Sequence, residues 1–251
     1  MPGSTIGEIV DLKVPDGTMR VFTTRGEVGG VGAGDWKYPA VIVIQEAFGA
    51  NDQIQGWSRR LAAEGYYTAA PVLYHRNGIN PTTAYDAQDE FMKLRLGISN
   101  DAMVTDLTAL MDYFKRSPNV DETRVGIVGF CMGGTVSFMA AARVPGIKAA
   151  AVYYGNRILV PDVEGGPTLL DEASNIKGPL IGFFGALDAG MTGEQLEVVK
   201  GKLKNAGVDA DINLYEGAGH GFMRDDDPGV FNKAASDDAW EKTLAFFKKN
   251  L

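Results

Sequence analysis

Cysteine and histidine are scarce in this sequence: 251 residues contain one Cys and two His. A single cysteine excludes an intramolecular disulfide and any metal site built from several cysteines. Two histidines are too few for a histidine-rich zinc site. We therefore expect no metal and no cofactor, and any chemistry must come from the side chains themselves.

Long apolar runs and an excess of basic residues are also missing. No apolar run approaches the ~20 residues of a membrane-spanning helix, and residues 1–5 lack the basic and apolar regions of a signal peptide. There are 24 Lys and Arg against 32 Asp and Glu, so the net charge is −8. We expect neither nucleic acid nor a membrane as a partner. We predict that the protein is cytoplasmic, because a free thiol persists in that compartment. We also expect a monomer or a small homo-oligomer.

The apolar content of 45% is sufficient for one core, and we expect a single domain over residues 1–251. Residues 39–44 are continuously apolar, as in a strand buried on both faces. Such strands alternate with helical segments, which predicts a largely parallel sheet with helices on both faces. We expect a helix over 81–96 and a long loop over 156–177. The segment 26–34 contains five glycines and is predicted to be a flexible loop. We do not expect it to bind a nucleotide, because no helix signal follows it at the required place.

The stretch Gly129-Phe130-Cys131-Met132-Gly133-Gly134 stands between a short apolar strand and an Ala-rich helix over 135–143. A strand, Gly-x-Cys-x-Gly and a helix in succession form the nucleophile-elbow pattern, with Cys in place of the usual Ser. So sharp a turn strains the residue at its tip, and flanking glycines let the two segments approach closely. At a helix N-terminus the dipole and the free N–H groups favour a thiolate. We predict that Cys131 is a nucleophile.

A thiol nucleophile needs a base, and the base needs an orienting acid. In folds with this elbow the order along the chain is nucleophile, acid, base. His220 is the one histidine after Cys131 and lies in a glycine-rich loop, so it is the predicted base. Asp188 directly follows a predicted strand and is the predicted acid. Two other acids, Asp162 and Asp171, compete, but neither follows a clear strand.

An oxyanion hole needs two N–H groups aimed at one point. One is predicted from Met132, directly after the nucleophile, and the other from Ala47, in the loop after the early central strand. The same loop carries Glu46 in apolar surroundings, where a carboxylate must find a partner or take up a proton. The other histidine, His75, precedes the nucleophile, and we expect it to be structural or to line a pocket.

At these residues the chain resembles the dienelactone hydrolase (carboxymethylenebutenolidase) family, from about residue 14 to the final helix. The resemblance is carried by the elbow, the Asp188 turn, Gln45-Glu46-Ala47-Phe48-Gly49, Pro71-Val72-Leu73-Tyr74, Tyr153-Tyr154-Gly155 and Gly219-His220-Gly221-Phe222. It implies an α/β-hydrolase fold with a Cys-Asp-His triad and with Met132 and Ala47 as oxyanion donors. It also implies that Glu46 sits against the resting thiol until substrate displaces it and the thiolate forms. Two aromatic residues, Phe48 and Tyr154, fall where the family binds substrate.

Substrates of that family are small lactones with a carboxylate, which needs a cationic partner. Arg224, four residues after His220, matches one family arginine. At the position of the other arginine this chain has Lys93, with Arg95 close by. Lysine is a point charge and cannot form the bidentate fork of arginine. The acidic run 225–227 follows Arg224 and is expected to weaken its pull on an anion.

The resulting prediction is a cysteine hydrolase that opens a small carboxylate-bearing lactone of the dienelactone type, through an acyl-thioester at Cys131. One alternative is a general carboxylesterase of the same fold that acts on small activated esters. A less favoured alternative is a non-catalytic binding protein of the same fold. Thiol reactivity separates these classes, because a binding protein predicts an inert, buried Cys131.

Overall fold

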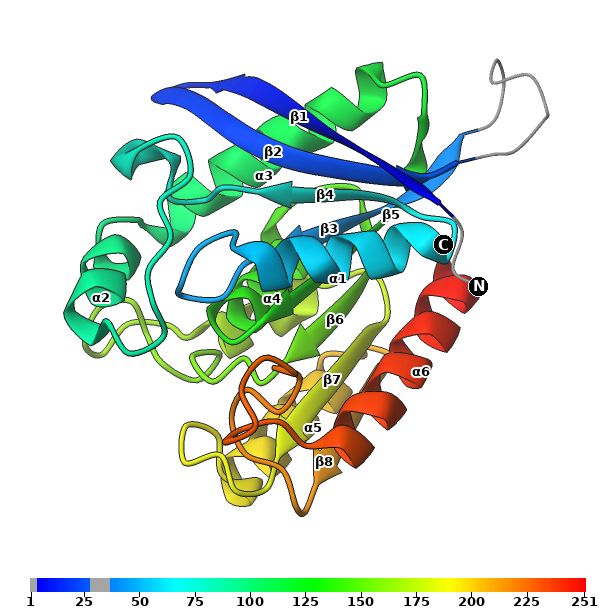
Figure 1. Ribbon diagram of the computed structural model, residues 1–251. Helices are drawn as coiled ribbons and strands as arrows, with labels where there is room; N and C mark the ends of the chain where they lie inside the picture. The colour runs from blue at the N-terminus through cyan, green and yellow to red at the C-terminus, as the bar shows by residue number, and fades with distance from the viewer. Residues whose placement is uncertain (1–3, 28–36) are drawn as a thin grey trace. The chain divides into compact units, whose positions relative to one another are not determined.

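The computed structural model describes residues 4–27 and 37–251 (Figure 1). Most of the glycine-rich segment 26–34 therefore lies outside the described residues. Contacts within the chain divide it into two compact units, residues 1–126 and 127–251. The expectation of a single domain stays a prediction.

A β-hairpin begins the first unit. Its two strands pair antiparallel from Thr5 opposite Gly26 to Val14 opposite Gly17, and Pro15 and Asp16 form the turn between them. The strand order in this unit is β1-β2-β4-β3-β5, with β2–β4 antiparallel and β3–β4 parallel. The bounds are β1 (Thr5–Val14), β2 (Gly17–Gly26), β3 (Tyr38–Ile44), β4 (Tyr67–Pro71) and β5 (Val120–Phe130), the last of which continues into the second unit.

One helix of the first unit departs from the sequence prediction. Helix α1 (Asp52–Ala63) begins after Asn51, whose side chain accepts a backbone N–H as an N-cap. Ser99 caps α3 (Asn100–Arg116) in the same way. The helix predicted over 81–96 is wrong in its first half, because α2 spans only Gln88–Leu96. No residue of α2 is buried, so no packed apolar face extends the helix toward residue 81. Figure 1 shows α1 in front of the strands of this unit and α3 behind them.

In the second unit the strand order is β5-β6-β7-β8, with β6–β7 and β7–β8 parallel. The predicted loop over 156–177 is wrong over residues 169–175, which form a 3-10 helix with a capping box at its start. This short helix contacts α4 and α5, so packing orders it. The bounds are β6 (Ile147–Tyr153), β7 (Leu180–Gly185), β8 (Ala210–Tyr215), α4 (Met132–Arg143), α5 (Gly193–Asn205) and α6 (Lys233–Asn250).

Several residues predicted for the site lie at or just beyond the carboxyl ends of these strands. Strand β5 leads into Cys131, β6 into Tyr154 and β7 into Asp188, and His220 lies in the loop after β8. In parallel sheets the carboxyl ends are where sites form. The predicted class, a mostly parallel sheet with helices, is confirmed. Among the described residues, no helix combines the length and apolarity needed to cross a membrane.

Candidate active site

The turn at Cys131 has the strained geometry of an elbow. Its backbone adopts φ 57° and ψ −117°, which is unfavourable for a residue with a side chain. A Cβ at Gly129 would lie 2.1 Å from the carbonyl oxygen of Gly133, and one at Gly134 would lie 2.3 Å from that of Tyr153. Only glycine fits at Gly129 and Gly134. The N–H of Cys131 donates to the carbonyl of Tyr153 at 3.1 Å, which ties the elbow to the end of β6.

A short hydrogen bond joins Asp188 to His220. Oδ2 of Asp188 lies 2.7 Å from Nδ1 of His220, and Oδ1 accepts the N–H of Gly190 at 2.7 Å. Burial opposes the charge of Asp188, but the hydrogen bond and the charge of His220 outweigh it, so the pKa of the carboxyl lies below its usual value. The N–H of Gly190 is a functional group absent from the sequence prediction. The spacing Asp-x-Gly, typical of an Asx turn, is the signal that indicates it.

The side chain of His220 also interacts with that of Cys131, and this interaction affects the pKa of the imidazole. Because Nδ1 faces Asp188, the ring nitrogen left for the thiol is Nε2. Burial alone would lower the pKa of His220, yet its interactions with Asp188 and Cys131 raise it to about 10. The structure thus brings together the residues predicted as acid, base and nucleophile. In this carboxylate–imidazole–thiol series the imidazole is able to take up the proton of the thiol.

The two competing acids have other surroundings. Asp171 accepts the N–H and the hydroxyl of Thr168, both at 2.8 Å, and forms an ion pair with Lys202. These bonds hold the pKa of Asp171 well below its usual value, the contact with Lys202 having the largest effect. Asp162 is exposed in the loop before it. Of the three candidate acids, Asp188 is therefore the one found at the base.

The predicted oxyanion donors lie in different units. Met132 is the first residue of α4, so its N–H is among those at a helix start that lack an intrahelical acceptor. In the first unit Ala47 is buried, and its carbonyl accepts the hydroxyl of Tyr74 at 3.0 Å. Glu46 is 3% exposed and forms a backbone bridge with Gly49. The roles of Ala47 and Glu46 stay predictions.

The cations predicted to bind a substrate carboxylate also occur in both units. In the second unit, Arg224 has Nη2 3.2 Å from Oδ2 of Asp227 and Nε 3.6 Å from Oδ1 of Asp226. Its side chain is only 12% exposed. In the first unit, Lys93 is exposed on α2, whereas Arg95 donates to a backbone carbonyl just beyond that helix at 3.5 Å. The charge of Arg224 is therefore already balanced within its own loop.

The two predicted aromatic contacts of substrate are packed against other rings. Phe48 meets Tyr85 and Phe91 edge-on, with ring centres 4.5 and 5.1 Å away. Tyr154 has no exposed surface, and its ring centre lies 5.0 Å from that of His220 at 63°. Tyr154 therefore contacts a substrate only if its neighbours move.

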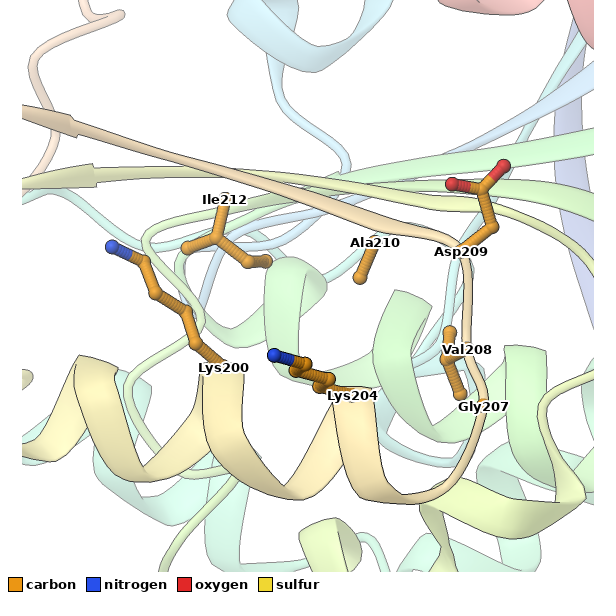
Figure 2. Close-up of a pocket in the computed structure, with 7 residues that line it drawn as sticks. All are labelled: Lys200, Lys204, Gly207, Val208, Asp209, Ala210 and Ile212. Carbon is orange, nitrogen blue, oxygen red and sulfur yellow. The ribbon is translucent and has the colours of Figure 1, made fainter.

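A cavity of about 580 Å³ lies between α5 and β8 (Figure 2). Figure 2 shows Lys200 and Lys204 reaching from α5 toward the strand, where Ile212 forms part of the floor. Lys200 is already paired with Glu197 at 2.8 Å. No predicted site residue is among those that line it: Lys200, Lys204, Gly207, Val208, Asp209, Ala210 and Ile212. We assign this cavity no role in the chemistry.

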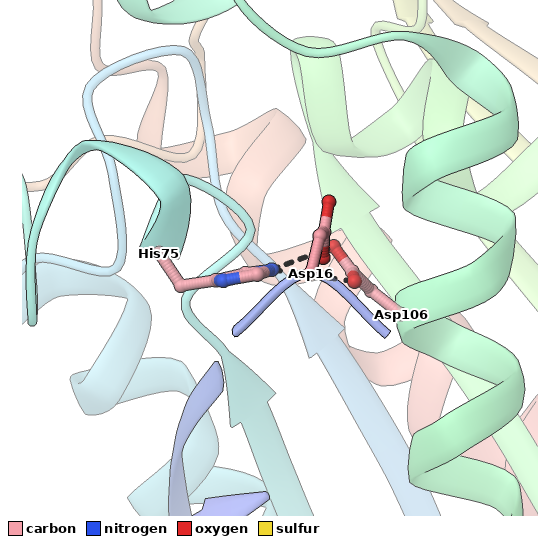
Figure 3. Close-up of side chains that lie close together, drawn as sticks. All are labelled: Asp16, His75 and Asp106. Carbon is pink, nitrogen blue, oxygen red and sulfur yellow. Dashed lines mark hydrogen bonds and ion pairs between the residues drawn. The ribbon is translucent and has the colours of Figure 1, made fainter. Parts of the chain in front are cut away.

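His75 lies in a cluster of charged side chains of the first unit (Figure 3). Its Nε2 is 3.2 Å from Oδ2 of Asp106, and neither side chain is more than 1% exposed. Together with Asp16, these residues offer three donor atoms within 4.8 Å of one another, a spacing that suits a metal ion. The guanidinium of Arg76 already binds both carboxylates and supplies the positive charge. The geometry therefore favours a structural role for His75.

Comparison with known proteins identifies relatives of this chain. Residues 29–251 match the sequence profile of the dienelactone hydrolase family. A Synechocystis protein with the provisional name carboxymethylenebutenolidase is 33% identical over 251 residues, which cover 96% of this chain and 99% of the relative. A Salmonella typhimurium protein with the same provisional name is 33% identical over 215 residues, covering 86% and 78%.

A solved structure extends the similarity to three dimensions. The crystal structure of a protein provisionally described as a dienelactone hydrolase, from Klebsiella pneumoniae, superposes with a TM-score of 0.88 at 29% identity. The match covers 98% of this chain and 99% of that one. The predicted α/β-hydrolase fold is confirmed.

Proposed function

The chain belongs to the dienelactone hydrolase family and is a hydrolase, and on that premise we propose that it cleaves small lactones or activated esters through an acyl-thioester on Cys131. The observation that carries this proposal is the series in which Asp188 hydrogen-bonds to His220 and His220 interacts with the side chain of Cys131. A thiol at a strained elbow, with a base on one side and a helix start behind it, suits nucleophilic attack on a carbonyl.

In the acylation half, His220 takes the thiol proton through Nε2, and the thiolate attacks the carbonyl carbon. The carbonyl oxygen becomes an oxyanion and accepts the N–H of Met132. Collapse of the tetrahedral intermediate breaks the C–O bond, and the proton on His220 passes to the leaving oxygen. In a lactone this leaving group stays tethered to the acyl group.

In the deacylation half, His220 takes a proton from water, and the hydroxide attacks the thioester carbon. The C–S bond breaks, the carboxylic acid forms, and the sulfur regains a proton from His220. Asp188 holds the proton on Nδ1 throughout, which leaves Nε2 free to accept and stabilises the imidazolium. The family resemblance adds Ala47 as a second oxyanion donor and Glu46 as a guard of the resting thiol.

The test uses the purified full chain with a dienelactone and with p-nitrophenyl acetate. We expect Cys131→Ala to abolish turnover of both, because no other thiol is present. Acid quenching of the wild type during turnover of p-nitrophenyl acetate should trap one acetyl group on Cys131, detected by mass spectrometry. Equal rates for wild type and Cys131→Ala would end the proposal.

A general carboxylesterase is a second candidate, and the ion pairs of Arg224 favour it. A substrate carboxylate needs a cation, but Asp226 and Asp227 already balance the charge of Arg224. An anionic substrate must therefore either displace these carboxylates from Arg224 or bind against their repulsion, whereas a neutral ester meets neither cost.

Rates on p-nitrophenyl acetate and on the matched hemisuccinate, which adds one carboxylate, separate the two candidates. A general esterase prefers the neutral ester, and Arg224→Gln changes that preference less than about threefold. A lactonase specific for carboxylate-bearing substrates prefers the anionic ester and loses the preference in Arg224→Gln.

A further inference from the structure

Tyr153 and Tyr154, at the end of β6, contact every segment that carries a member of the proposed triad. The carbonyl of Tyr153 accepts the N–H of Cys131 at 3.1 Å. The N–H of Tyr154 donates at 2.8 Å to the carbonyl of Phe183, in the strand that precedes the proposed acid. The ring of Tyr154 meets the imidazole of His220 at 5.0 Å between centres. One dipeptide thus links nucleophile, acid strand and base.

The backbone of Tyr154 is strained. Its φ is 38°, in a region that residues with a side chain rarely adopt. A Cβ at the next residue, Gly155, would lie 2.7 Å from the backbone nitrogen of Thr135, so this segment is pressed against the start of α4. Such strain persists only where the surroundings over-determine it, and it is concentrated at functional sites.

The loop that carries His220 is anchored by backbone hydrogen bonds, such as that from the N–H of Leu187 to the carbonyl of Ala218 at 2.9 Å, but these bonds do not set the side-chain torsions of the imidazole. Three glycines, Gly217, Gly219 and Gly221, lie in or beside this loop, and Gly221 has φ 76°. The side chain of His220 is 34% exposed, so solvent covers part of the ring. Its orientation therefore depends on its side-chain contacts, which include the edge-on ring of Tyr154.

We propose that Tyr154 is a positioning residue, whose buried ring holds the imidazole of His220 with Nδ1 toward Asp188 and Nε2 toward Cys131. The inference rests on the proposed function, and it assigns Tyr154 a task other than substrate contact. A residue with no exposed surface suits this task, because it stays in place as substrate enters and leaves.

Three variants test the proposal through kinetics. Tyr154→Leu removes the ring, Tyr154→Phe keeps it, and Phe247→Leu removes a buried ring from α6 as a matched control. We expect Tyr154→Leu to lose about 10- to 100-fold in kcat, with KM within about threefold of wild type. Tyr154→Phe and the control should stay within about threefold of wild type in kcat. A raised KM with an unchanged kcat in Tyr154→Leu would instead indicate substrate contact and overturn the proposal.

Proton NMR tests the geometry independently of turnover. The chain has two histidines, so the His220 signals are assigned by their loss in His220→Gln. In Tyr154→Leu the pKa of His220 should fall toward 6.5, because a loosened ring loses its interactions with Asp188 and Cys131. An unchanged titration would overturn the proposal.

A test on the wild type does not depend on the folding of any variant. We expect a nuclear Overhauser contact between the rings of His220 and Tyr154. Its absence would also overturn the proposal. If Cys131→Ala left turnover unchanged, the proposed function would fail, while these NMR results would still decide whether Tyr154 holds His220.

Discussion

Replacing Asp188 with Asn is expected to reverse the hydrogen bonding of His220. In the wild type, Oδ1 of Asp188 accepts the N–H of Gly190 at 2.7 Å, while Oδ2 faces Nδ1 of His220 at 2.7 Å. An asparagine amide has one oxygen and one NH2 group. The N–H of Gly190 requires the oxygen, so the NH2 group must face Nδ1 and donate to it. The imidazole then carries its proton on Nε2 and cannot accept the proton of Cys131.

The size of this effect follows from what the variant loses. A base in the wrong tautomer costs about 10⁴-fold in kcat where a comparable triad has been altered in this way. We expect a loss of about 10³- to 10⁴-fold in kcat/KM, equivalent to about 4 to 5.5 kcal/mol in activation free energy. The amide has nearly the shape of the carboxylate, so the variant should remain folded.

Initial rates with p-nitrophenyl acetate at pH 7 measure the effect, and thermal unfolding checks the fold. Asp171→Asn is the matched control, because the Asp171 carboxylate binds Lys202 and Thr168 rather than His220. This substitution is expected to change the rate by less than about twofold. Nitrogen NMR should find the ring proton on Nε2 in Asp188→Asn. Activity of Asp188→Asn within tenfold of the wild type, or an equal loss in Asp171→Asn, would refute the reasoning.

Three further perturbations test other parts of the structure. Asp106→Asn removes the charge of a fully buried carboxylate that binds Arg76 and should lower the free energy of unfolding in urea by about 3 kcal/mol. Asp11→Asn, at an exposed ion pair, should change it by less than about 1 kcal/mol. Gly134→Ala places a Cβ 2.3 Å from the carbonyl oxygen of Tyr153 at the elbow and should reduce kcat/KM about 100-fold. Its control, Gly201→Ala, lies in open space on α5; it should keep the activity and raise the free energy of unfolding by about 0.5 to 1 kcal/mol. The pKa of His220 is raised above its unfolded value of 6.5, so its contribution to stability is complete below pH 6.5 and is lost as pH rises toward 10. The melting temperature of the wild type should therefore exceed that of His220→Gln most at about pH 6, and a difference that grows with pH would contradict the assignment.

Local steric patterns made parts of the site predictable. The elbow at Cys131 was recognisable because its glycines and its strand-to-helix switch are adjacent in the chain. Chain order then singled out His220 and Asp188, since each follows a strand and only one histidine lies beyond the nucleophile. The same local logic failed for residues 81–87, where a helix signal lacks the packed apolar face that would sustain it.

The sequence by itself determined the type of sheet, the elbow and the identity of the three residues of the proposed triad, because each depends on neighbouring residues or on their order. Only the tertiary structure decided the contacts between distant segments. These include the bond from Asp188 to His220, the ion pairs of Arg224 and the burial of Tyr154 against the imidazole. Such contacts depend on how strands and loops pack, and the pattern of residues along any one segment does not encode them.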